Sequence, residues 1–333
     1  MSLSNMSSID WNHEEVGVGL MSHNTLTPSA VRSWGDDERA ALLGLLRLQP
    51  DGLGWHEIVD EVSECASARV VWERHIPAAL FGNDDTDQVL DRAHADIERW
   101  RNAEYHFHTF MDDTYPERLR SVRQVPPFVF TWGERLDHDL GVSIVGSRKM
   151  SARGANFART TARLLAERGT TIIAGLALGI DTVAHEQALR SGGRTVAVLG
   201  NGIEYSYPRQ NTDLQRTIAE RGMLLSQYMP DFRPTRWSFP ERNVTMSAYG
   251  YATVIVEATE ISGTRIQARE AVAHGRPVIL SVDVATSTRW AHDLVHQPGV
   301  FVAGTPEEAV ERIDTVLRHE RLVMDLLSFG TTG

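Results

Sequence analysis

The sequence has almost no cysteine and no long hydrophobic run. Cys65 is the only cysteine among 333 residues, which excludes a disulfide within the chain and any cysteine-rich zinc site. No apolar run reaches the roughly 18 residues that a membrane-spanning helix needs. Residues 1–20 have neither a basic start nor an apolar core, so they do not form a signal peptide. These absences predict a soluble, cytoplasmic protein.

Lysine is also nearly absent, because Lys149 is the only one and arginine supplies the rest of the positive charge. The formal net charge of −11 argues at first against a nucleic-acid ligand. The charges are unevenly distributed, however. Residues 141–280 hold 17 basic and 11 acidic residues, whereas the rest of the chain holds 16 basic and 33 acidic residues. The basic middle of the chain is a candidate for contact with a polyanion, although GC-rich codon usage also accounts for abundant arginine.

The length suggests about two domains, and the hydrophobic pattern divides the chain accordingly. Residues 1–35 are polar and lack a hydrophobic period, so we predict a disordered leader. From Asp36 onward apolar residues recur at helical spacing, with a break at residues 50–52 and an acidic helix over residues 87–101. We therefore predict a small helical, SAM-like domain over residues 36–104 and a second domain over residues 105–330.

In the second domain short apolar runs alternate with helical stretches. Such alternation is typical of a parallel sheet covered by helices on both faces. We therefore predict an α/β fold with an extended Rossmann-like, doubly wound, mostly parallel sheet, whose ligand lies beyond the carboxyl ends of the strands. The predicted strands are residues 142–146, 171–174, 195–199, 223–226, 253–257, 277–282 and 300–303, and the predicted helices are residues 153–168, 181–190, 212–221, 265–274 and 306–327.

The loop after the first of these strands contains Gly146, Ser147, Arg148 and Lys149, with Ser151 as a predicted helix cap. Glycine permits a sharp turn, and a helix N-terminus with two nearby cations attracts an anion. The loop therefore predicts a phosphate site, although it matches neither the G-x-G-x-x-G motif nor the P-loop. A basic turn on a solvated edge is the alternative interpretation.

The loop after the second strand contains Gly175 and Gly179, followed by Asp181 and His185. Two glycines that bracket a turn permit a ligand to approach the backbone closely. Asp181 is predicted to cap the next helix, and His185 shares its helix face. A cap and a buried, hydrogen-bonded histidine are favoured over a catalytic dyad.

The segment of residues 228–243 interleaves cations with aromatic rings and contains three prolines. Cations that follow phosphates, alternating with rings on which bases stack, are typical of proteins that bind single strands without reading their sequence. The alternative is a loop whose rings fill the core. The cations are Arg233, Arg236 and Arg242, the rings are Tyr228, Phe232, Trp237 and Phe239, and Tyr205, Tyr207 and Arg209 repeat the pattern more weakly.

Two further patterns resemble enzymatic sites. Residues 292–296 imitate the H-E-x-x-H zinc motif, but Asp293 is too short to place a general base well and no third ligand follows, so we predict no metal. Glu257 and Glu260, beside residues 262–264, form either a carboxylate pair at a strand end or a helix start at which acids favour the dipole.

Taken in order, these loops resemble the DprA/Smf family, the DNA-processing proteins of bacterial transformation. The motifs that carry the resemblance are IVGSRKMSARG (144–154), AGLALGIDTVAH (174–185), VAVLGNGIEYSYPRQN (196–211), DFRPTRWSFPERN (231–243) and VIVEATEISGT (254–264). The resemblance extends upstream to residues 112–134 and covers about two thirds of the chain. Five motifs in the same order are specific for a family.

The resemblance implies a protein without catalytic activity or cofactor that binds and protects single-stranded DNA. It also implies a homodimer that loads the RecA recombinase during DNA uptake or recombination. By motif position Gly146, Ser147 and Arg148 hold one phosphate, Arg236 holds a second, Phe239 packs against a base, and Arg242 and Asn243 line the same pocket. The full set of expected DNA-binding residues is Gly146, Ser147, Arg148, Lys149, Gly175, Gly179, Arg236, Phe239, Arg242, Asn243, Ser262, Gly263 and Thr264.

Three features depart from the family pattern. Val244 stands where the family usually has a second arginine, residues 281–283 replace a Pro-Gly turn, and we expect no C-terminal winged helix after residue 327. Two other functions stay open. One is a sensor that binds a small nucleotide at the same phosphate loop. The other is a phosphoribohydrolase-like enzyme, for which Gln267 replaces the glutamate that the motif of those enzymes requires.

Overall fold

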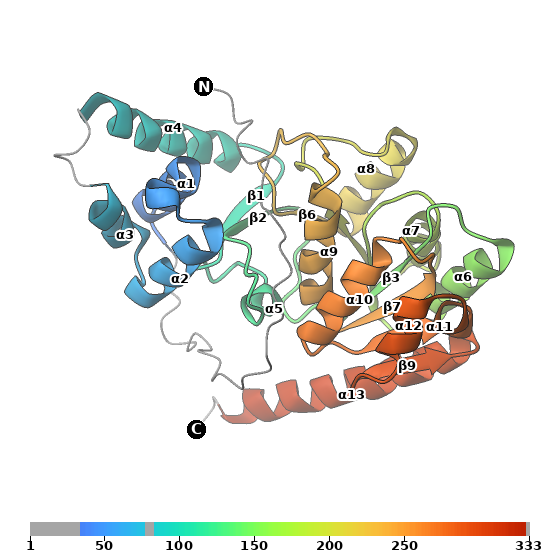
Figure 1. Ribbon diagram of the computed structural model, residues 1–333. Helices are drawn as coiled ribbons and strands as arrows, with labels where there is room; N and C mark the ends of the chain where they lie inside the picture. Colours follow the sequence, from blue (N-terminus) through green and yellow to red (C-terminus); the bar gives the residue numbers. More distant parts are fainter. Residues whose placement is uncertain (1–33, 77–82, 331–333) are drawn as a thin grey trace.

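A sheet of nine strands forms the centre of the structure (Figure 1). The computed structural model describes residues 34–76 and 83–330, so the predicted leader lies almost entirely outside the described residues. The strands lie in the order β1-β2-β6-β5-β4-β3-β7-β8-β9. Their bounds are β1 His106–Thr109, β2 Phe128–Gly133, β3 Gly141–Gly146, β4 Thr171–Ala174, β5 Thr195–Leu199, β6 Met223–Ser226, β7 Ala252–Glu257, β8 Val278–Ser281 and β9 Val300–Ala303.

The seven strands from β3 to β9 all pair in parallel, whereas β1 pairs antiparallel with β2, and β2 with β6. From β3 the chain winds outward through β4, β5 and β6, and it then crosses to the other side of β3 to form β7, β8 and β9. This reversal makes a doubly wound sheet with its switch point between β3 and β7. The predicted Rossmann-like, mostly parallel sheet is confirmed.

Helices cover both faces of the sheet. One face carries α6 (Ala152–Ala166), α7 (Ile180–Arg190), α8 (Thr212–Arg221) and α13 (Pro306–Gly330). The other carries α5 (Glu117–Arg120), α9 (Ser238–Tyr249), α10 (Thr264–Ala273), α11 (Val282–Ser287) and α12 (Arg289–Leu294).

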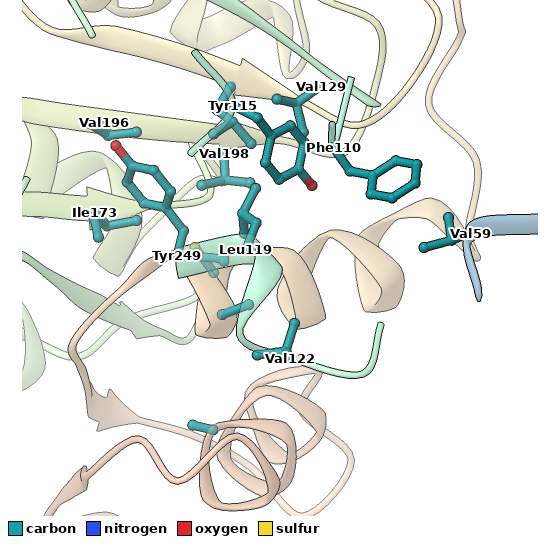
Figure 2. Packing of buried hydrophobic residues seen from close by; sticks show 14 of the residues in the cluster. Val59, Phe110, Tyr115, Leu119, Val122, Val129, Ile173, Val196, Val198 and Tyr249 are labelled. Carbon is teal, nitrogen blue, oxygen red and sulfur yellow. The ribbon is translucent and has the colours of Figure 1, made fainter. Parts of the chain in front are cut away.

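Alternate side chains of each strand pack against the helices on opposite faces, because successive Cβ atoms point to opposite faces of a sheet. Ile172 of β4 packs in the cluster under α6 and α7, whereas its neighbour Ile173 packs under α9. Figure 2 shows Tyr249 of α9 beside Ile173 and Val196 in that second layer. All four of these residues are buried. The strands are thus anchored on both sides, and their carboxyl ends form a stable edge.

Four helices precede the sheet, namely α1 (Asp36–Leu48), α2 (Trp55–Cys65), α3 (Ala68–His75) and α4 (Asn83–Arg101). They pack together and against the side of the sheet formed by β1 and β2 (Figure 1). Leu43 and Ile97 share a buried cluster with Phe130 of β2. Arg39 Nη2 of α1 also lies 2.8 Å from Asp112 Oδ1, beyond β1. Because these contacts join the helices to the sheet, the predicted domain boundary near residue 104 stays a prediction.

Most predicted elements in the second domain agree with the structure to within about two residues at each end. The main difference is α9, which begins at Ser238 inside the segment that the sequence suggested as a stiff loop. Pro240 is compatible with this helix because the first turn tolerates proline. Strand β1 has the sequence HFHT and so contains no apolar run, and the six-residue helices α11 and α12 were too short to give a periodic signal. Within the described residues, none of the helices combines the length and apolar character needed to cross a bilayer.

The first prediction concerns His75, which joins α3 to α2 and to the turn at residues 50–52. Hydrogen bonds to Glu61 and then to Asp51 raise the pKa of His75 above its ordinary value of 6.5, against the effect of burial. The bonds therefore stabilise the fold fully below pH 6.5, and the stabilisation is lost as the pH rises through the higher folded-state pKa. In urea denaturation, His75→Gln should reduce the free energy of unfolding by up to about 1 kcal/mol at acidic pH and by much less at alkaline pH.

The exposed His319 of α13 provides the control, and His319→Gln should leave unfolding unchanged at both pH values. A loss in His75→Gln that is the same at acidic and alkaline pH would contradict the role of the protonated ring.

Candidate nucleic-acid interface

The candidate site lies at the switch point, where β3 and β7 end side by side. Gly146 closes β3 and pairs with Glu257 at the end of β7, across a β-bulge. A Cβ atom on residue 146 would lie 2.8 Å from Ile180 Cγ1 and 2.9 Å from the Glu257 carbonyl oxygen. Residue 146 must therefore lack a side chain for α7 and β7 to approach so closely. The loop of residues 147–151 starts from this packed position.

That loop presents two cations to solvent. The Ser147 hydroxyl folds it, because Oγ accepts from the Lys149 N–H at 3.1 Å and donates to the Lys149 carbonyl oxygen at 2.8 Å. Arg148 and Lys149 are both exposed. Over the part of the chain that the structure describes, no acidic side chain lies within ion-pair distance of either one. Two positive charges are therefore available at the switch point.

The N-terminus of α6, in contrast, is already occupied by a protein carboxylate. Ser151 caps this helix as predicted, because its Oγ accepts from the Gly154 N–H at 3.0 Å. Glu257 accepts from Ser151 N at 3.0 and 3.1 Å and from Ser151 Oγ at 2.6 Å. The expectation that the helix N-terminus itself holds a phosphate therefore needs correction, because Glu257 takes that position. Any phosphate here must rely on the side chains of Arg148 and Lys149.

The same contacts decide between the two interpretations of Glu257 and Glu260. Glu260 accepts from the backbone N–H of Arg289 at 2.9 Å, where α12 begins. Each acid thus lies at the start of a different helix, where a carboxylate is favoured by the dipole. The two side chains serve as helix-end partners and do not form a catalytic pair.

The loop after β4 is fastened to the loop after β3. Ile180 N donates to the Ser147 carbonyl oxygen at 3.2 Å. Gly179 has a φ of +86°, and a Cβ atom on it would lie 2.3 Å from that same oxygen. Glycine is required here because the backbones of the two loops touch. The predicted close approach at Gly179 is therefore to another loop of the protein.

Gly175 makes room for a buried arginine. A Cβ atom on residue 175 would lie 2.2 Å from Arg242 Nη1. Arg242 is only 4% exposed, its Nη1 donates to the carbonyl oxygens of Gly175 and Val198, and its Nε donates to Asn243 Oδ1 at 3.1 Å. The expectations that Arg242 lines a DNA pocket and that Gly175 approaches a ligand stay predictions, and in this structure both residues lie beneath the surface. Arg242 instead lies under the loops and joins the ends of β4 and β5 to α9.

Asp181 balances this buried charge. Its carboxylate accepts from the N–H groups of Gly175 at 2.9 Å and Ala177 at 3.4 Å. Burial raises the pKa of Asp181, and the nearby Arg242 guanidinium opposes that shift. Burial lowers the pKa of Arg242, and Asp181 opposes that shift in turn. Asp181 is not the N-cap of α7 that was predicted, because Gly179 holds that position and Asp181 lies in the first turn.

His185 is a core residue. It is fully buried, and its Nδ1 lies 2.7 Å from the Thr195 hydroxyl. That hydroxyl donates to the Ile172 carbonyl oxygen, so the imidazole must donate to it. Burial lowers the pKa of His185 to about 3, which keeps the ring neutral. The structure gives no hydrogen bond between Asp181 and His185, which agrees with the preference for a buried histidine over a catalytic dyad.

Asn243 links α9 to the loop after β7. Its Nδ2 donates to the Gly263 carbonyl oxygen at 3.3 Å, and the hydroxyls of Ser262 and Thr264 lie 2.7 Å apart. These contacts place Asn243 beside the loop that follows β7, and binding of DNA by these residues stays a prediction. Gln267, one turn into α10, is 1% exposed, and its side-chain amide has no partner among the described residues. A buried amide in place of the motif glutamate disfavours a phosphoribohydrolase.

Three of the four rings in the segment 228–243 pack on one another. Tyr228 is 7% exposed and stacks on Phe232 with ring centroids 4.7 Å apart. Trp237 lies 5.4 Å from Phe232, and the Tyr228 hydroxyl donates to the Ser238 carbonyl oxygen at 2.8 Å. Of these three rings, Tyr228 agrees best with the alternative interpretation, in which the rings fill the core. The contacts among the three rings stabilise the backbone that leads into α9.

The fourth ring, Phe239, lies at the surface beside the first loop. The Arg148 guanidinium carbon is 5.3 Å from its ring centroid, a cation–π distance. Tyr207, from the loop after β5, lies 5.6 Å from Phe239 between ring centroids and is 38% exposed. Arg236 is exposed one turn before Phe239, and it too has no ion pair among the described residues. The structure thus brings Arg148 and Tyr207, from the loops after β3 and β5, together with Phe239 in the first turn of α9.

Residues 292–296 carry the two histidines that imitate a zinc motif. The rings of His292 and His296 lie 5.8 Å apart between centroids. In the described ranges, no three His, Cys, Asp or Glu side chains gather in an arrangement that would hold a metal ion.

Comparisons with known proteins bear on this site. The sequence matches the family model for DNA recombination-mediator protein A over residues 106–313. Protein Smf from Synechocystis sp. is 36% identical over 209 residues, which cover 60% of this chain and 52% of that protein. This chain spans about half the length of several curated relatives that it matches.

Two solved structures are similar. One is DNA processing protein A from Helicobacter pylori, described for its single-stranded DNA binding mode, with a TM-score of 0.56 and 26% identity over 66% of this chain and 98% of that chain. The other is the X-ray structure of DprA from Streptococcus pneumoniae, with a TM-score of 0.62 and 24% identity over 84% of this chain and 98% of that chain. The second likeness shows a shared fold.

The second prediction tests the buried arginine. Arg242→Met keeps much of the side-chain volume but leaves Asp181 without its buried counter-charge and the carbonyls of Gly175 and Val198 without a donor. The free energy of unfolding should fall by about 3–5 kcal/mol, as when one partner of a buried ion pair is removed. Chemical denaturation of the full chain measures the loss.

Arg236→Met removes the same charge from an exposed position and should change stability by no more than about 0.5 kcal/mol. Equal stability of the two variants would show that Arg242 does not hold the loops together.

Proposed function

This chain belongs to the DNA recombination-mediator protein A family, the DprA/Smf proteins, and we propose that it binds single-stranded DNA along the carboxyl edge of its parallel strands. One observation carries the proposal. Arg148, Lys149 and Arg236 are exposed and have no acidic partners among the described residues, and Arg148 lies over the ring of Phe239, next to that of Tyr207. The single-stranded DNA binding described for the H. pylori relative supports the same ligand.

The chemistry of these side chains suits a single strand. Guanidinium and ammonium groups neutralise phosphates, and aromatic rings stack on bases whose faces are uncovered. A duplex hides those faces between its own base pairs. Every base offers a stacking face, so we expect preference for single strands with little dependence on sequence.

The electrostatics of the edge also decide how phosphates are held. Glu257 fills the N-terminus of α6, so mobile side chains rather than a helix dipole supply the attraction. The whole chain has a net charge of −11, and its acidic residues lie mainly outside residues 141–280. Binding should therefore depend on a local positive edge and should weaken steeply as salt rises.

We further propose that the chain acts in the cytoplasm as a homodimer that protects single-stranded DNA and loads a RecA-type recombinase. Family membership supports this role. We propose no catalytic step at the edge, because Gln267 is buried and replaces a carboxylate, and Glu257 and Glu260 are engaged at helix starts.

The third prediction tests the edge directly. Arg148→Ala combined with Arg236→Ala should weaken binding to a labelled oligothymidine at least about tenfold at low salt. It should also reduce the slope of log affinity against log salt by about 1.4, because two phosphate contacts are lost at about 0.7 each. Fluorescence anisotropy at several salt concentrations measures both quantities.

The matched control is Arg163→Ala with Arg190→Ala. These arginines are paired with Glu167 and Glu186 on α6 and α7, away from the loops. The control should bind nearly as the wild type does. If both double variants bind alike, the cations at the switch point do not hold the strand.

The fourth prediction concerns Glu257. Glu257→Gln keeps a hydrogen-bond acceptor at the start of α6 but removes a negative charge from the edge. Affinity for oligothymidine should rise a few-fold, because two like charges about 4 Å apart repel by about 1 kcal/mol even where bulk water screens them. Glu186→Gln, the same charge change on α7, should have little effect. Unchanged or weaker binding by Glu257→Gln, with α6 intact by circular dichroism, would contradict competition between this carboxylate and DNA.

A further inference from the structure

We propose that Tyr207, rather than Phe239, is the residue on which a DNA base stacks, and that Phe239 instead positions Arg148. This inference rests on the proposed binding of single-stranded DNA and assigns roles within that site. It departs from the role that resemblance to the family gives Phe239.

Two contacts take up part of the surface of the partly buried Phe239 ring. The Arg148 guanidinium lies over the ring, with its carbon 5.3 Å from the centroid. The backbone of Gly200 lies against one side, so closely that a Cβ atom there would come within 2.7 Å of Phe239 Cδ1 and 3.0 Å of Cε1. A base that stacked on Phe239 would have to displace Arg148 and lose its cation–π contact. The ring is thus already a platform for a cation.

Tyr207 is more exposed than Phe239. Its side chain is 38% exposed, and its ring meets Phe239 at 37° with a centroid separation of 5.6 Å. Among the described residues, its hydroxyl has no hydrogen-bond partner within the protein. It therefore offers a ring beside the Arg148–Phe239 pair, where a base adjoining a bound phosphate would lie.

The loop that carries Tyr207 is held in place. Asn201 Nδ2 donates to the carbonyl oxygens of Gly202 and Tyr205, at 2.9 and 2.6 Å. Asn211 Nδ2 donates to the Leu176 carbonyl oxygen at 2.9 Å, which ties the far end of the loop to the loop after β4. Because the backbone is fixed on both sides, the ring is presented before a ligand arrives. A preorganised ring loses less conformational entropy on binding.

The neighbouring charge continues the pattern. Arg209 follows two residues after Tyr207, is exposed, and has no ion pair in the described part of the chain. Arg148 beside Phe239, the neighbouring Tyr207 ring and Arg209 two residues further along the chain give the alternation of cation, ring and cation that suits successive nucleotides. The geometry points to a strand that passes from Arg148 across Tyr207 toward Arg209.

The fifth prediction separates base stacking from phosphate contact. The probes are an oligothymidine and an oligonucleotide of equal length with abasic sites, which keeps the phosphates and lacks the bases. Tyr207→Ala should bind oligothymidine about tenfold more weakly than the wild type does, because one stacked base is lost, and should bind the abasic strand within about twofold of the wild type. Tyr207→Phe, which keeps the ring, should behave as the wild type does.

Phe239→Leu should give the opposite pattern. It removes the platform under Arg148, so it should weaken binding of both strands to a similar degree and preserve the preference for thymidine. A strand that contains 2-aminopurine adds an independent signal. Its fluorescence should be quenched on binding to the wild type and to Tyr207→Phe, and much less on binding to Tyr207→Ala.

The inference is overturned if Tyr207→Ala binds oligothymidine as the wild type does, or if it weakens both strands equally. It is also overturned if Phe239→Leu, and not Tyr207→Ala, abolishes the preference for thymidine. These outcomes leave the proposed function standing. Failure of the wild-type chain to bind either strand would instead refute the proposed function itself, and with it the assignment of Tyr207.

Discussion

A single buried guanidinium organises the edge on which the proposed function depends. Arg242 of α9 lies beneath the strand-end loops and donates to the carbonyl oxygens of Gly175 and Val198, at the ends of β4 and β5. A buried charge is tolerated only where its donors are satisfied and an opposite charge is near, and here backbone carbonyls and Asp181 meet both needs. Gly175 is a glycine because the guanidinium takes the space of its side chain. The buried Arg242 therefore fixes the conformation of the strand-end loops that cover it.

At the surface above Arg242, the negative and the positive side chains have different partners. Carboxylates at the edge are engaged with helix N-termini, as Glu257 is with α6 and Glu260 is with α12. Arg148, Lys149 and Arg236 have no such partners among the described residues. The acids stabilise the scaffold and the arginines remain available to a ligand. This division explains how a chain with a net charge of −11 presents a cationic edge.

Much of the fold followed from local pattern, whereas much of the site did not. Apolar runs such as Thr171–Ala174, bounded by glycine and polar residues, located the strands, whereas the order of the strands in the sheet, and with it the switch point between β3 and β7, came from the structure. The burial of Arg242 was not readable because an arginine in a polar, aromatic segment is usually exposed. Glu257 and Ser151 are 106 positions apart in the sequence, so no local spacing predicts their contact. Pro234 and Pro240 concealed the start of α9, and with it the placement of Phe239 beside Arg148.

The most direct test of the account is to map where a bound strand touches the protein. Photocrosslinking of a 5-iodouracil oligonucleotide to the full chain, followed by mass spectrometry of the peptides, identifies the contacts without any substitution. The account predicts crosslinks in the loops after β3 and β5 and at the start of α9. Crosslinks confined to the four N-terminal helices or to α13, with none in those loops, would contradict it.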